Sequence, residues 1–395
     1  MMVSFISPEE FRDKLDRGED LHLIDTRSKS DFEEWHIGGA INFPHAEGKK
    51  LEEGNLQELC DAEGIETNDQ IITVCAKGIT SASLAEELKD NGFSDVKTIE
   101  GGLRAWSGLY DRVPVATNND DLIIIQLQRR AKGCLGYVVG SKRSGTAAAF
   151  DVSRYTKEFI DAATEKGLKI THVFDTHVHA DHISGGRELA DKLGVNYFLG
   201  SDVKDRAPDF NYVPVKSNQV IEVGELQIKA VHTPGHTTEM TSWLLGSEAL
   251  ISGDSLFVDS IGRTELEFEE DAERGAVLQY RSLLEKILSL PDRIKILPGH
   301  FSVSNSGESG GLTPGTPIFS TVGYLRKNNR ALQMEKDEFV DYMFSNLPTK
   351  PPNYEDVIGI NLGRRERGSE EEEIELELGP NRCAASEESM VEESN

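Results

Sequence analysis

Short apolar runs alternate with amphipathic stretches along the first 116 residues. The runs at 21–26 and 70–75 have the length and composition of buried strands. The stretches at 7–18 and 81–92 begin with serine, carry apolar residues at helical spacing and end with glycine, which predicts two helices. Because strands that alternate with helices pack into a parallel sheet, residues 1–116 are predicted to form a parallel α/β domain.

A second unit follows a short polar connection. Proline, threonine, asparagine and aspartate cluster at 113–121, and we place the linker itself at 117–121. From 122 to 365 many short apolar runs predict strands, and the patterns at 154–167 and 275–290 predict helices between them. This second unit is therefore predicted to be a separate domain that contains both strands and helices.

The net charge of the chain makes some classes of binding partner unfavourable. There are 42 Lys and Arg against 69 Asp and Glu, a net charge of −27, which disfavours nucleic acids and anionic membranes. Residues 369–395 hold ten Glu and one Arg, so 366–395 is predicted to be an acidic disordered tail. No apolar run is long enough to span a bilayer and no signal-peptide pattern begins the chain, so a cytoplasmic location is expected. Whether the chain forms a homo-oligomer is left open.

Histidines and aspartates gather at the ends of four predicted strands. These residues are His177, His179, Asp181, His182, His232, Asp254 and His300. A buried imidazole or carboxylate without a partner costs several kcal/mol, so ordinary packing rarely leaves such a cluster. Strand ends hold side chains on rigid backbone, and a sandwich of sheets would collect these ends along one rim. The pattern therefore predicts a metal site.

The segment HVHADH at 177–182 carries an HxHxDH signature and resembles the metallo-β-lactamase-fold superfamily. The resemblance spans about 120–365, with the later histidines and aspartate in the order that the superfamily shows. It implies an αββα sandwich with the metal site along one edge. Two different chemistries occur in the superfamily, and both are considered.

If all seven residues bind metal, the resemblance implies two Zn²⁺ ions per chain bridged by Asp254, as in glyoxalase II, a thioester hydrolase. If His177, His232 and Asp254 alone bind metal, the set is two histidines and one carboxylate, which suits one Fe²⁺ per chain and O₂. Persulfide dioxygenases resemble this second case. The residues then expected to surround the iron ligands without binding the ion are His179, Asp181, His182 and His300.

One segment favours the dioxygenase. Residues 253–266 are similar to a persulfide dioxygenase segment in which an arginine, here Arg263, meets a carboxylate of the thiol substrate. A planar guanidinium suits that role, and the alternative is a salt bridge to a neighbouring glutamate. Cys134, in a stretch that resembles an early strand pair of the family, is expected to be a small buried hydrophobic residue.

Cys75 stands between a predicted strand and a predicted helix. Backbone N–H groups and the helix dipole at such a position favour a thiolate and a persulfide anion. The segments 23–44 and 100–106 resemble the rhodanese family, which implies that Cys75 carries sulfane sulfur. Thr80 stands where the family loop usually has arginine, and Lys77 is expected to supply part of that charge to the substrate.

The other cysteines are expected to be free thiols. The four cysteines lie far apart and form no CxxC pair, which argues against disulfides and a zinc ribbon. Cys60 has helical spacing with Leu56 and Leu59 and is expected to pack. Cys383 falls in the predicted tail, with no catalytic group near it in sequence.

The sequence thus predicts a rhodanese-like domain followed by a metallo-β-lactamase-fold domain. The favoured function is a persulfide dioxygenase that oxidises a low-molecular-weight thiol persulfide with O₂ to sulfite, fused to a sulfurtransferase. The alternatives are a dinuclear-zinc thioester hydrolase and a non-catalytic sulfur carrier or sensor. The identity of the thiol carrier and the order of the two sulfur reactions stay open.

Overall fold

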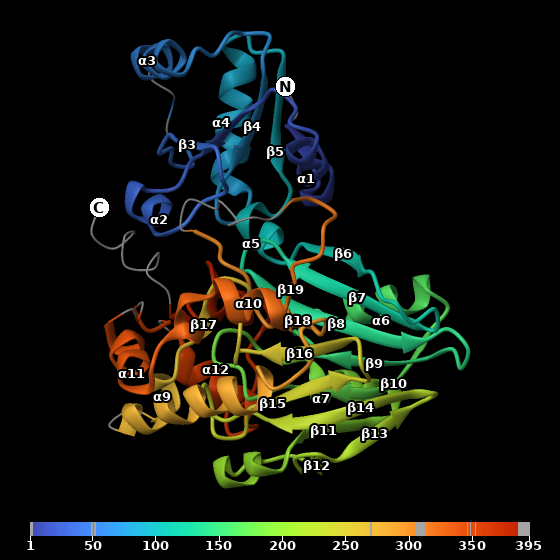
Figure 1. Ribbon diagram of the computed structural model, residues 1–395. Coiled ribbons are helices and arrows are strands. Elements are labelled where there is room, and N and C mark those ends of the chain that lie inside the picture. The colour runs from blue at the N-terminus through green and yellow to red at the C-terminus, as the bar shows by residue number, and fades with distance from the viewer. Residues whose placement is uncertain are drawn as a thin grey trace.

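The computed structural model contains two sheet-bearing units stacked along one axis (Figure 1). It describes residues 3–48, 50, 53–268, 271–304, 313–345, 347, 349–351 and 353–385. Among the described helices, none has the length and apolar character needed to cross a bilayer.

The first unit is a parallel five-stranded sheet with helices on its faces, as predicted. Its strands are β1 (Ser4–Ile6), β2 (His22–Asp25), β3 (Ala40–Asn42), β4 (Gln70–Val74) and β5 (Asp95–Ile99), in the order β1-β5-β4-β2-β3. Its helices are α1 (Pro8–Asp16), α2 (Lys29–Glu34), α3 (Glu53–Glu63), α4 (Ile79–Asp90) and α5 (Gly102–Ser107). The predicted N-cap Ser7 accepts a hydrogen bond from the N–H of Glu10 at 3.1 Å, which satisfies one of the free donors of α1.

The boundary between the units lies earlier than the sequence suggested. Strand β6 (Tyr110–Val115) pairs antiparallel with β7 (Leu122–Arg129), so it belongs to the second unit. The predicted linker, residues 117–121, lies in the loop that joins β6 and β7 as a hairpin. The physical reason is that Val113 and Val115, interpreted from the sequence as part of a polar connection, are buried and pair with β7 of the second unit.

The second unit is an αββα sandwich, as predicted. One sheet has the order β12-β11-β10-β9-β8-β7-β6, and the other has the order β13-β14-β15-β16-β18-β19. The remaining strands of the first of these sheets are β8 (Cys134–Ser141), β9 (Thr146–Phe150), β10 (Lys169–Phe174), β11 (Asn196–Gly200) and β12 (Val213–Val215). The strands of the second are β13 (Val220–Val223), β14 (Leu226–His232), β15 (Thr241–Leu245), β16 (Ala249–Gly253), β18 (Lys295–Pro298) and β19 (Ser320–Thr321).

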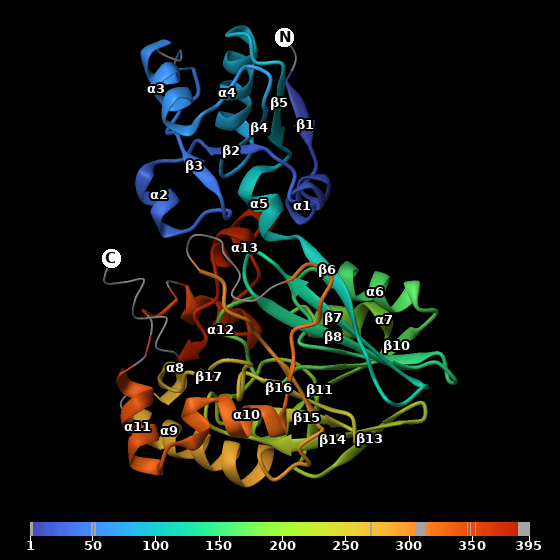
Figure 2. The ribbon, with the colours of Figure 1, turned by 45° about the horizontal axis from the view of Figure 1, so that its top comes forward.

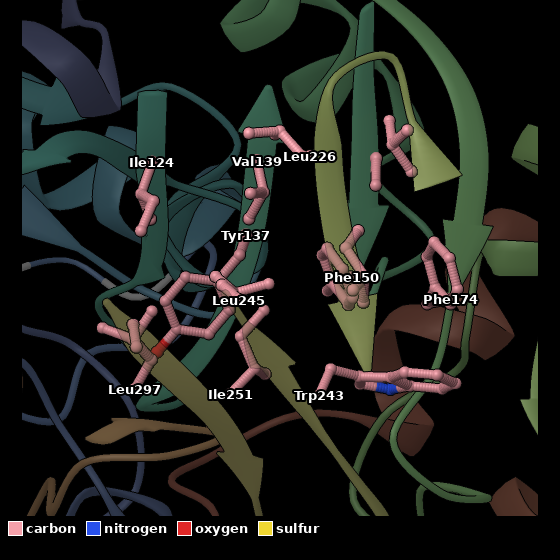
Figure 3. Close-up of a cluster of buried hydrophobic side chains, with 14 of the residues drawn as sticks. Ile124, Tyr137, Val139, Phe150, Phe174, Leu226, Trp243, Leu245, Ile251 and Leu297 are labelled. Atoms are coloured by element: carbon pink, nitrogen blue, oxygen red, sulfur yellow. The ribbon is translucent and has the colours of Figure 1, made fainter. Parts of the chain in front are cut away.

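Helices cover the outer face of each sheet, and an apolar core fills the space between the sheets. The covering helices are α6 (Thr156–Glu165) and α7 (Gly186–Leu193) on one side, and α9 (Ala272–Arg281), α10 (Val322–Asn328) and α11 (Lys336–Ser345) on the other. In the core, Phe150 stacks on Phe174, and Phe174 meets Trp243 of the opposite sheet edge-on at 4.8 Å between ring centroids (Figure 3). This packing fixes the strand ends that carry the candidate ligands.

The acidic C-terminal segment is folded through residue 385, unlike the predicted disordered tail. It forms α12 (Tyr354–Asn361), α13 (Glu370–Leu376) and β20 (Ala384–Ala385), and β20 pairs with β17 (Ile261–Gly262). Helix α13 lies between the two units (Figure 2). The buried carboxylate of Glu377 pairs with Arg129 and Arg154 of the second unit, a long-range pairing that composition does not reveal. The part of the predicted tail at 386–395 lies outside the described residues.

Candidate metal centre and cysteine loop

Four loops of the sandwich bring histidines and aspartates together at one edge. The loops follow β10, β14, β16 and β18, and they carry His177, His236, Asp254 and His300 respectively. Strands β16 and β18 are adjacent and parallel, so the loops after them emerge side by side. The predicted collection of strand ends along one rim is therefore present in the fold.

The metal-capable atoms of His177, His236 and Asp254 form one buried group within 4.8 Å of one another. The Nε2 of His177 lies 3.9 Å from the Oδ2 of Asp254, and the Nε2 of His236 lies 3.5 Å from the same oxygen. Bonds of about 2.1 Å to a shared ion place ligand atoms roughly 3–3.5 Å apart. The group is thus close to the size that one ion requires.

Hydrogen bonds orient both imidazoles toward this point. The Nδ1 of His236 donates to the carbonyl of Arg263 at 2.6 Å. The hydroxyl of Thr176 donates to Asp151 and accepts from the Nδ1 of His177 at 2.9 Å. Each Nε2 therefore keeps its lone pair for an ion, the usual arrangement for a metal-binding histidine.

Unpartnered atoms indicate that the group fits a cation. Among the described residues, the Nε2 of His177 and the Oδ2 of Asp254 are buried and have no hydrogen-bond partner, which is costly without a ligand. Burial and the neighbouring His179 hold the pKa of His177 well below its ordinary value, so this imidazole is neutral. Burial alone would raise the pKa of Asp254, but His300, His177 and His236 lower it. A neutral imidazole and an ionised carboxylate are metal-binding forms.

The structure does not bring His232 into this group. Its Nε2 donates to the carbonyl of Thr238 at 2.9 Å and lies 3.3 Å from Asp202, and the side chain is 27% exposed. His236, which the sequence analysis did not select, stands beside Asp254 instead. The signal for it is the Thr-Pro-Gly sequence that separates the two histidines.

The turn between the histidines depends on Gly235. Its φ is +153°, and an added Cβ would lie 2.4 Å from the Cα of Gln279. The side chain of Gln279 accepts from the N–H of His236 at 3.1 Å and so fixes the turn. The chain leaves β14 at His232 and returns to the metal centre only at His236, which is the physical reason for the difference.

The other predicted residues lie around this group, and three of them, Asp181, His182 and His300, bond to one another. His300 bridges two carboxylates, with Nδ1 2.8 Å from the Oδ1 of Asp254 and Nε2 2.9 Å from the Oδ2 of Asp181. The Nδ1 of His182 lies 3.1 Å from the Oδ1 of Asp181. His179 faces Asp151, with its Nε2 3.4 Å from Oδ1. Burial opposes ionisation of Asp181, but His182 and His300 hold its pKa well below the usual range.

Two cysteines complete the surroundings, and sequence reasoning assigned a metal-site role to neither. The thiol of Cys134 donates to the Oδ2 of Asp181 at 3.1 Å. The sulfur of Cys383 lies within 4.8 Å of ligand atoms of Asp254 and His300. Burial and the charge of Asp181 raise the pKa of Cys383, and a bound cation would act in the opposite direction. For Cys383 the local sequence holds no signal, because β20 is placed by pairing with a distant strand.

Arg263 is buried and engaged with the protein itself. Its guanidinium donates to Glu265 and to the carbonyls of Arg382, at 2.8 Å, and Thr349, at 3.2 Å. The salt bridge to a neighbouring glutamate, considered as the alternative, is the contact present here. Arg263 therefore fixes the C-terminal segment against the metal centre, whereas its proposed contact with a substrate carboxylate stays a prediction.

In the first unit, Cys75 lies in the predicted cradle between β4 and α4. Its sulfur accepts from the N–H of Gly78 at 3.1 Å and from the hydroxyl of Ser81 at 3.3 Å. Burial opposes the thiolate, but hydrogen bonds from the hydroxyls of Ser81 and Thr80 and from backbone N–H groups lower the pKa of Cys75. The ammonium of Lys77 is about half exposed at this loop and lies 3.8 Å from Glu371 of α13. Cys60 is partly buried and packs, as expected, against the apolar cluster that contains Leu56.

Comparisons with known proteins follow this two-part division. Residues 7–109 match the family described as rhodanese-like domain, and residues 144–300 match the metallo-beta-lactamase superfamily. A hydroxyacylglutathione hydrolase from Pelagibacter ubique is 26% identical over 248 residues, which are 62% of this chain and 94% of the relative. The mitochondrial persulfide dioxygenase ETHE1 of Bos taurus is 27% identical over 256 residues, 64% of this chain and 92% of the relative.

Solved structures are similar to part of the chain. A metallo-beta-lactamase from Staphylococcus aureus superposes with a TM-score of 0.56 at 33% identity, covering 62% of this chain and 73% of that one. ETHE1 from Myxococcus xanthus superposes with a TM-score of 0.53 at 25% identity, covering 61% of this chain and 99% of that one. The relatives include both a hydrolase and a dioxygenase. The chain therefore belongs to the metallo-beta-lactamase superfamily and carries a rhodanese-like domain ahead of the metallo-beta-lactamase domain.

Proposed function

We propose that the chain is a persulfide dioxygenase fused to a sulfurtransferase. It would oxidise a low-molecular-weight thiol persulfide with O₂, and the rhodanese-like domain would carry sulfane sulfur on Cys75. The observation that carries this proposal is the group of His177, His236 and Asp254, whose ligand atoms face one point while the neighbouring His300 bonds to Asp181 and Asp254.

The contacts of His300 favour one ion over two. A second ion would need His300, Asp181 and His182, whose metal-capable atoms lie, with that of Cys134, within 4.8 Å of one another. In the structure both nitrogens of His300 are instead at hydrogen-bond distance from carboxylates, 2.8 Å from the Oδ1 of Asp254 and 2.9 Å from the Oδ2 of Asp181. Two histidines and one carboxylate with open positions suit non-heme Fe(II) and O₂. The residues around this set would then orient it, as outer partners of metal ligands do.

The overall reaction balances with water as the third reactant: RSSH + O₂ + H₂O → RSH + SO₃²⁻ + 2 H⁺. Fe(II) held by His177, His236 and Asp254 would supply the redox chemistry with O₂. The chain's own contribution is orientation: Thr176 and the carbonyl of Arg263 aim the two imidazoles. His300 holds the other oxygen of Asp254, which leaves Oδ2 available to an ion.

The rhodanese-like domain supplies a second reason for sulfur chemistry. Its cysteine lies among donors that favour a thiolate and would equally stabilise a persulfide anion. Because the two domains are joined in one chain, the product of one site has a higher local concentration at the other site. The likeness to persulfide dioxygenases and the presence of a rhodanese-like domain in one chain support the same assignment.

A thiol-ester hydrolase with two zinc ions is the second candidate, and one observation favours it. Among the described residues, both nitrogens of His179 and the Nε2 of His182 are buried without a hydrogen-bond partner. A second ion, or one ion in a different position, would accept these nitrogens as ligands. The hydroxyacylglutathione hydrolase relatives support this alternative.

Metal analysis of anaerobically purified protein, paired with O₂ uptake on glutathione persulfide, tests the proposal. We expect about one iron per chain and O₂ uptake with sulfite as product. Two zinc ions, no O₂ uptake and hydrolysis of a glutathione thioester would contradict the dioxygenase and establish the hydrolase. Sulfur loading of Cys75 without turnover at either substrate would instead identify a carrier or sensor.

A further inference from the structure

The C-terminal segment places a thiol against the candidate metal centre. The sulfur of Cys383 lies within 4.8 Å of ligand atoms of Asp254 and His300, and the residue is 1% exposed. Among the described residues, its thiol makes no hydrogen bond, whereas the thiol of Cys134 nearby donates to Asp181. A second buried atom of the same group, the Oδ2 of Asp254, also has no hydrogen-bond partner there. An orphaned buried carboxylate oxygen beside a buried thiol points to a ligand at this place.

The position of Cys383 is built by specific contacts. Strand β20 pairs with β17 immediately after Cys383, with Gly262 opposite Ala384. The N–H of Arg263 donates to the carbonyl of Cys383 at 2.9 Å. The N–H of Cys383 donates to the Oδ1 of Asn381 at 3.3 Å. The same Arg263 holds the preceding carbonyl of Arg382, so the thiol is fixed from both sides.

A small pocket between the two domains reaches Arg382, the residue that precedes this thiol. It holds about 40 Å³ and is lined by Trp35 of the rhodanese-like domain, by Asp181 of the metal centre, and by Asn381 and Arg382 of the C-terminal segment. Lys132 also lines it and donates to the carbonyl of Glu377 at 3.0 Å. Residues 379–382 of the pocket wall directly precede Cys383 in the chain, so the pocket marks the side on which the outer sulfur of a donor approaches the thiol.

We propose, on the basis of the dioxygenase function above, that Cys383 accepts sulfane sulfur and that its persulfide is the species oxidised. The outer sulfur of a donor RSSH reaches Cys383, the S–S bond of the donor breaks, and a new S–S bond forms between that sulfur and the Sγ of Cys383. The inner sulfur leaves as RSH, and no electrons are exchanged. Oxidation then follows Cys383–SSH + O₂ + H₂O → Cys383–SH + SO₃²⁻ + 2 H⁺, which oxidises the outer sulfur, reduces O₂ and restores the thiol.

This assignment changes the substrate class of the metal domain. The oxidised persulfide belongs to the protein, and the diffusible thiol only delivers sulfur. The free thiol RSH is then released before O₂ is consumed. The chemistry also accepts sulfur donors whose carriers differ in shape, since only the outer sulfur must reach Cys383.

Direct detection of the protein persulfide tests the assignment without turnover. The full-length metal-free protein is incubated anaerobically with glutathione persulfide, alkylated, digested and examined by mass spectrometry. We expect one added sulfur atom on the Cys383 peptide as well as on the Cys75 peptide, with Cys60 as the unmodified internal control. Sulfur on Cys75 alone would overturn the assignment. This readout needs no variant, so it does not depend on whether a substituted chain folds.

The iron-loaded Cys383→Ala and Cys383→Ser variants give the second measurement, with Cys60→Ser as control. We expect both Cys383 variants to lose O₂ uptake while retaining iron. Uptake at the wild-type rate in either iron-loaded variant would overturn the role of Cys383 and leave the dioxygenase function standing. Sulfur loading of Cys383 in a wild-type protein that binds iron but consumes no O₂ would instead contradict the dioxygenase function.

Discussion

The Nε2 of His236 lies 3.5 Å from the Oδ2 of Asp254, inside a buried group that also contains His177. His232, only four residues earlier, lies at the end of β14 and bonds to the carbonyl of Thr238. Two histidines of one turn therefore have different surroundings. This difference provides a matched pair of substitutions.

We expect His236→Ala to lose the bound metal and all O₂ uptake, and His232→Ala to retain both. Removal of a neighbour of a ligand typically costs 10–100-fold in metal affinity, and loss of the ligand itself should cost at least as much. Metal content after desalting, together with O₂ uptake, is the measurement. If His236→Ala retained the metal and His232→Ala lost it, then His232, and not His236, would be the metal ligand.

The hydroxyl of Thr176 should matter for metal affinity although it does not face the ion. It accepts from the Nδ1 of His177 at 2.9 Å and so selects the tautomer with a free Nε2. We expect Thr176→Val to weaken metal binding by about 10–100-fold. Thr171→Val is the control, because Thr171 makes the same contact with His172, at 2.9 Å, away from the centre. Competition with a metallochromic chelator measures both, and equal affinities would contradict the tautomer argument.

Sequence reasoning located most of the metal centre because its ligands follow strand ends. His177, Asp254 and His300 come directly after buried apolar runs, and parallel neighbours such as β16 and β18 deliver their loops to one edge. His236 was missed because it lies beyond a turn. The distance between a strand end and a ligand is set by that turn, here by Gly235, and not by the apolar pattern.

The fold of the C-terminal segment was missed for a different reason. Its composition is acidic. Composition gives the net charge of a segment but does not show which basic residues elsewhere in the chain neutralise it. Glu377 is paired with Arg129 and Arg154, more than two hundred residues earlier in the chain. Strand β20 is likewise placed by β17. Only the folded topology brings these groups together.

The thiolate of Cys75 should depend on Ser81. The hydroxyl of Ser81 donates to the sulfur at 3.3 Å, and with Thr80 and backbone N–H groups it outweighs burial and lowers the pKa of Cys75. Ser81→Ala removes one donor to the anion and should raise that pKa, so the pH profile of alkylation moves to higher pH. Hydrogen bonds to charged groups contribute about 1.5–3 kcal/mol, which corresponds to at least a roughly tenfold slower alkylation at neutral pH.

Iodoacetamide labelling of the Cys75 peptide, followed by mass spectrometry from acid to alkaline pH, measures this shift. Ser83→Ala is the control, since Ser83 lies on the same helix and is partly exposed. An unchanged profile in Ser81→Ala would mean that the backbone donors, such as the N–H of Gly78, stabilise the thiolate alone.

The carboxylate of Glu377 joins the C-terminal segment to the metal domain through a buried ion triad. It lies 2.8 Å from the Nη1 of Arg129 and 3.1 Å from the Nε of Arg154, and it accepts from the N–H of Ile183 at 2.6 Å. Glu377→Gln leaves two buried guanidinium groups without a counter-charge. The free energy of unfolding at neutral pH should fall by about 3–5 kcal/mol. Glu375→Gln, which alters an exposed pair with Arg104, should cost no more than about 1 kcal/mol.

The pH dependence of this difference gives a second, independent readout. Burial alone would raise the pKa of Glu377, but Arg129 and Arg154 outweigh it and lower the pKa. A carboxylate with a lowered folded-state pKa stabilises the protein above the unfolded-state value of about 4.3, and this stabilisation is lost as the pH falls through the folded-state pKa. Urea unfolding curves of wild type and Glu377→Gln should therefore converge as the solution is acidified. A difference in unfolding free energy that is independent of pH would mean that Glu377 acts through packing and not through its charge.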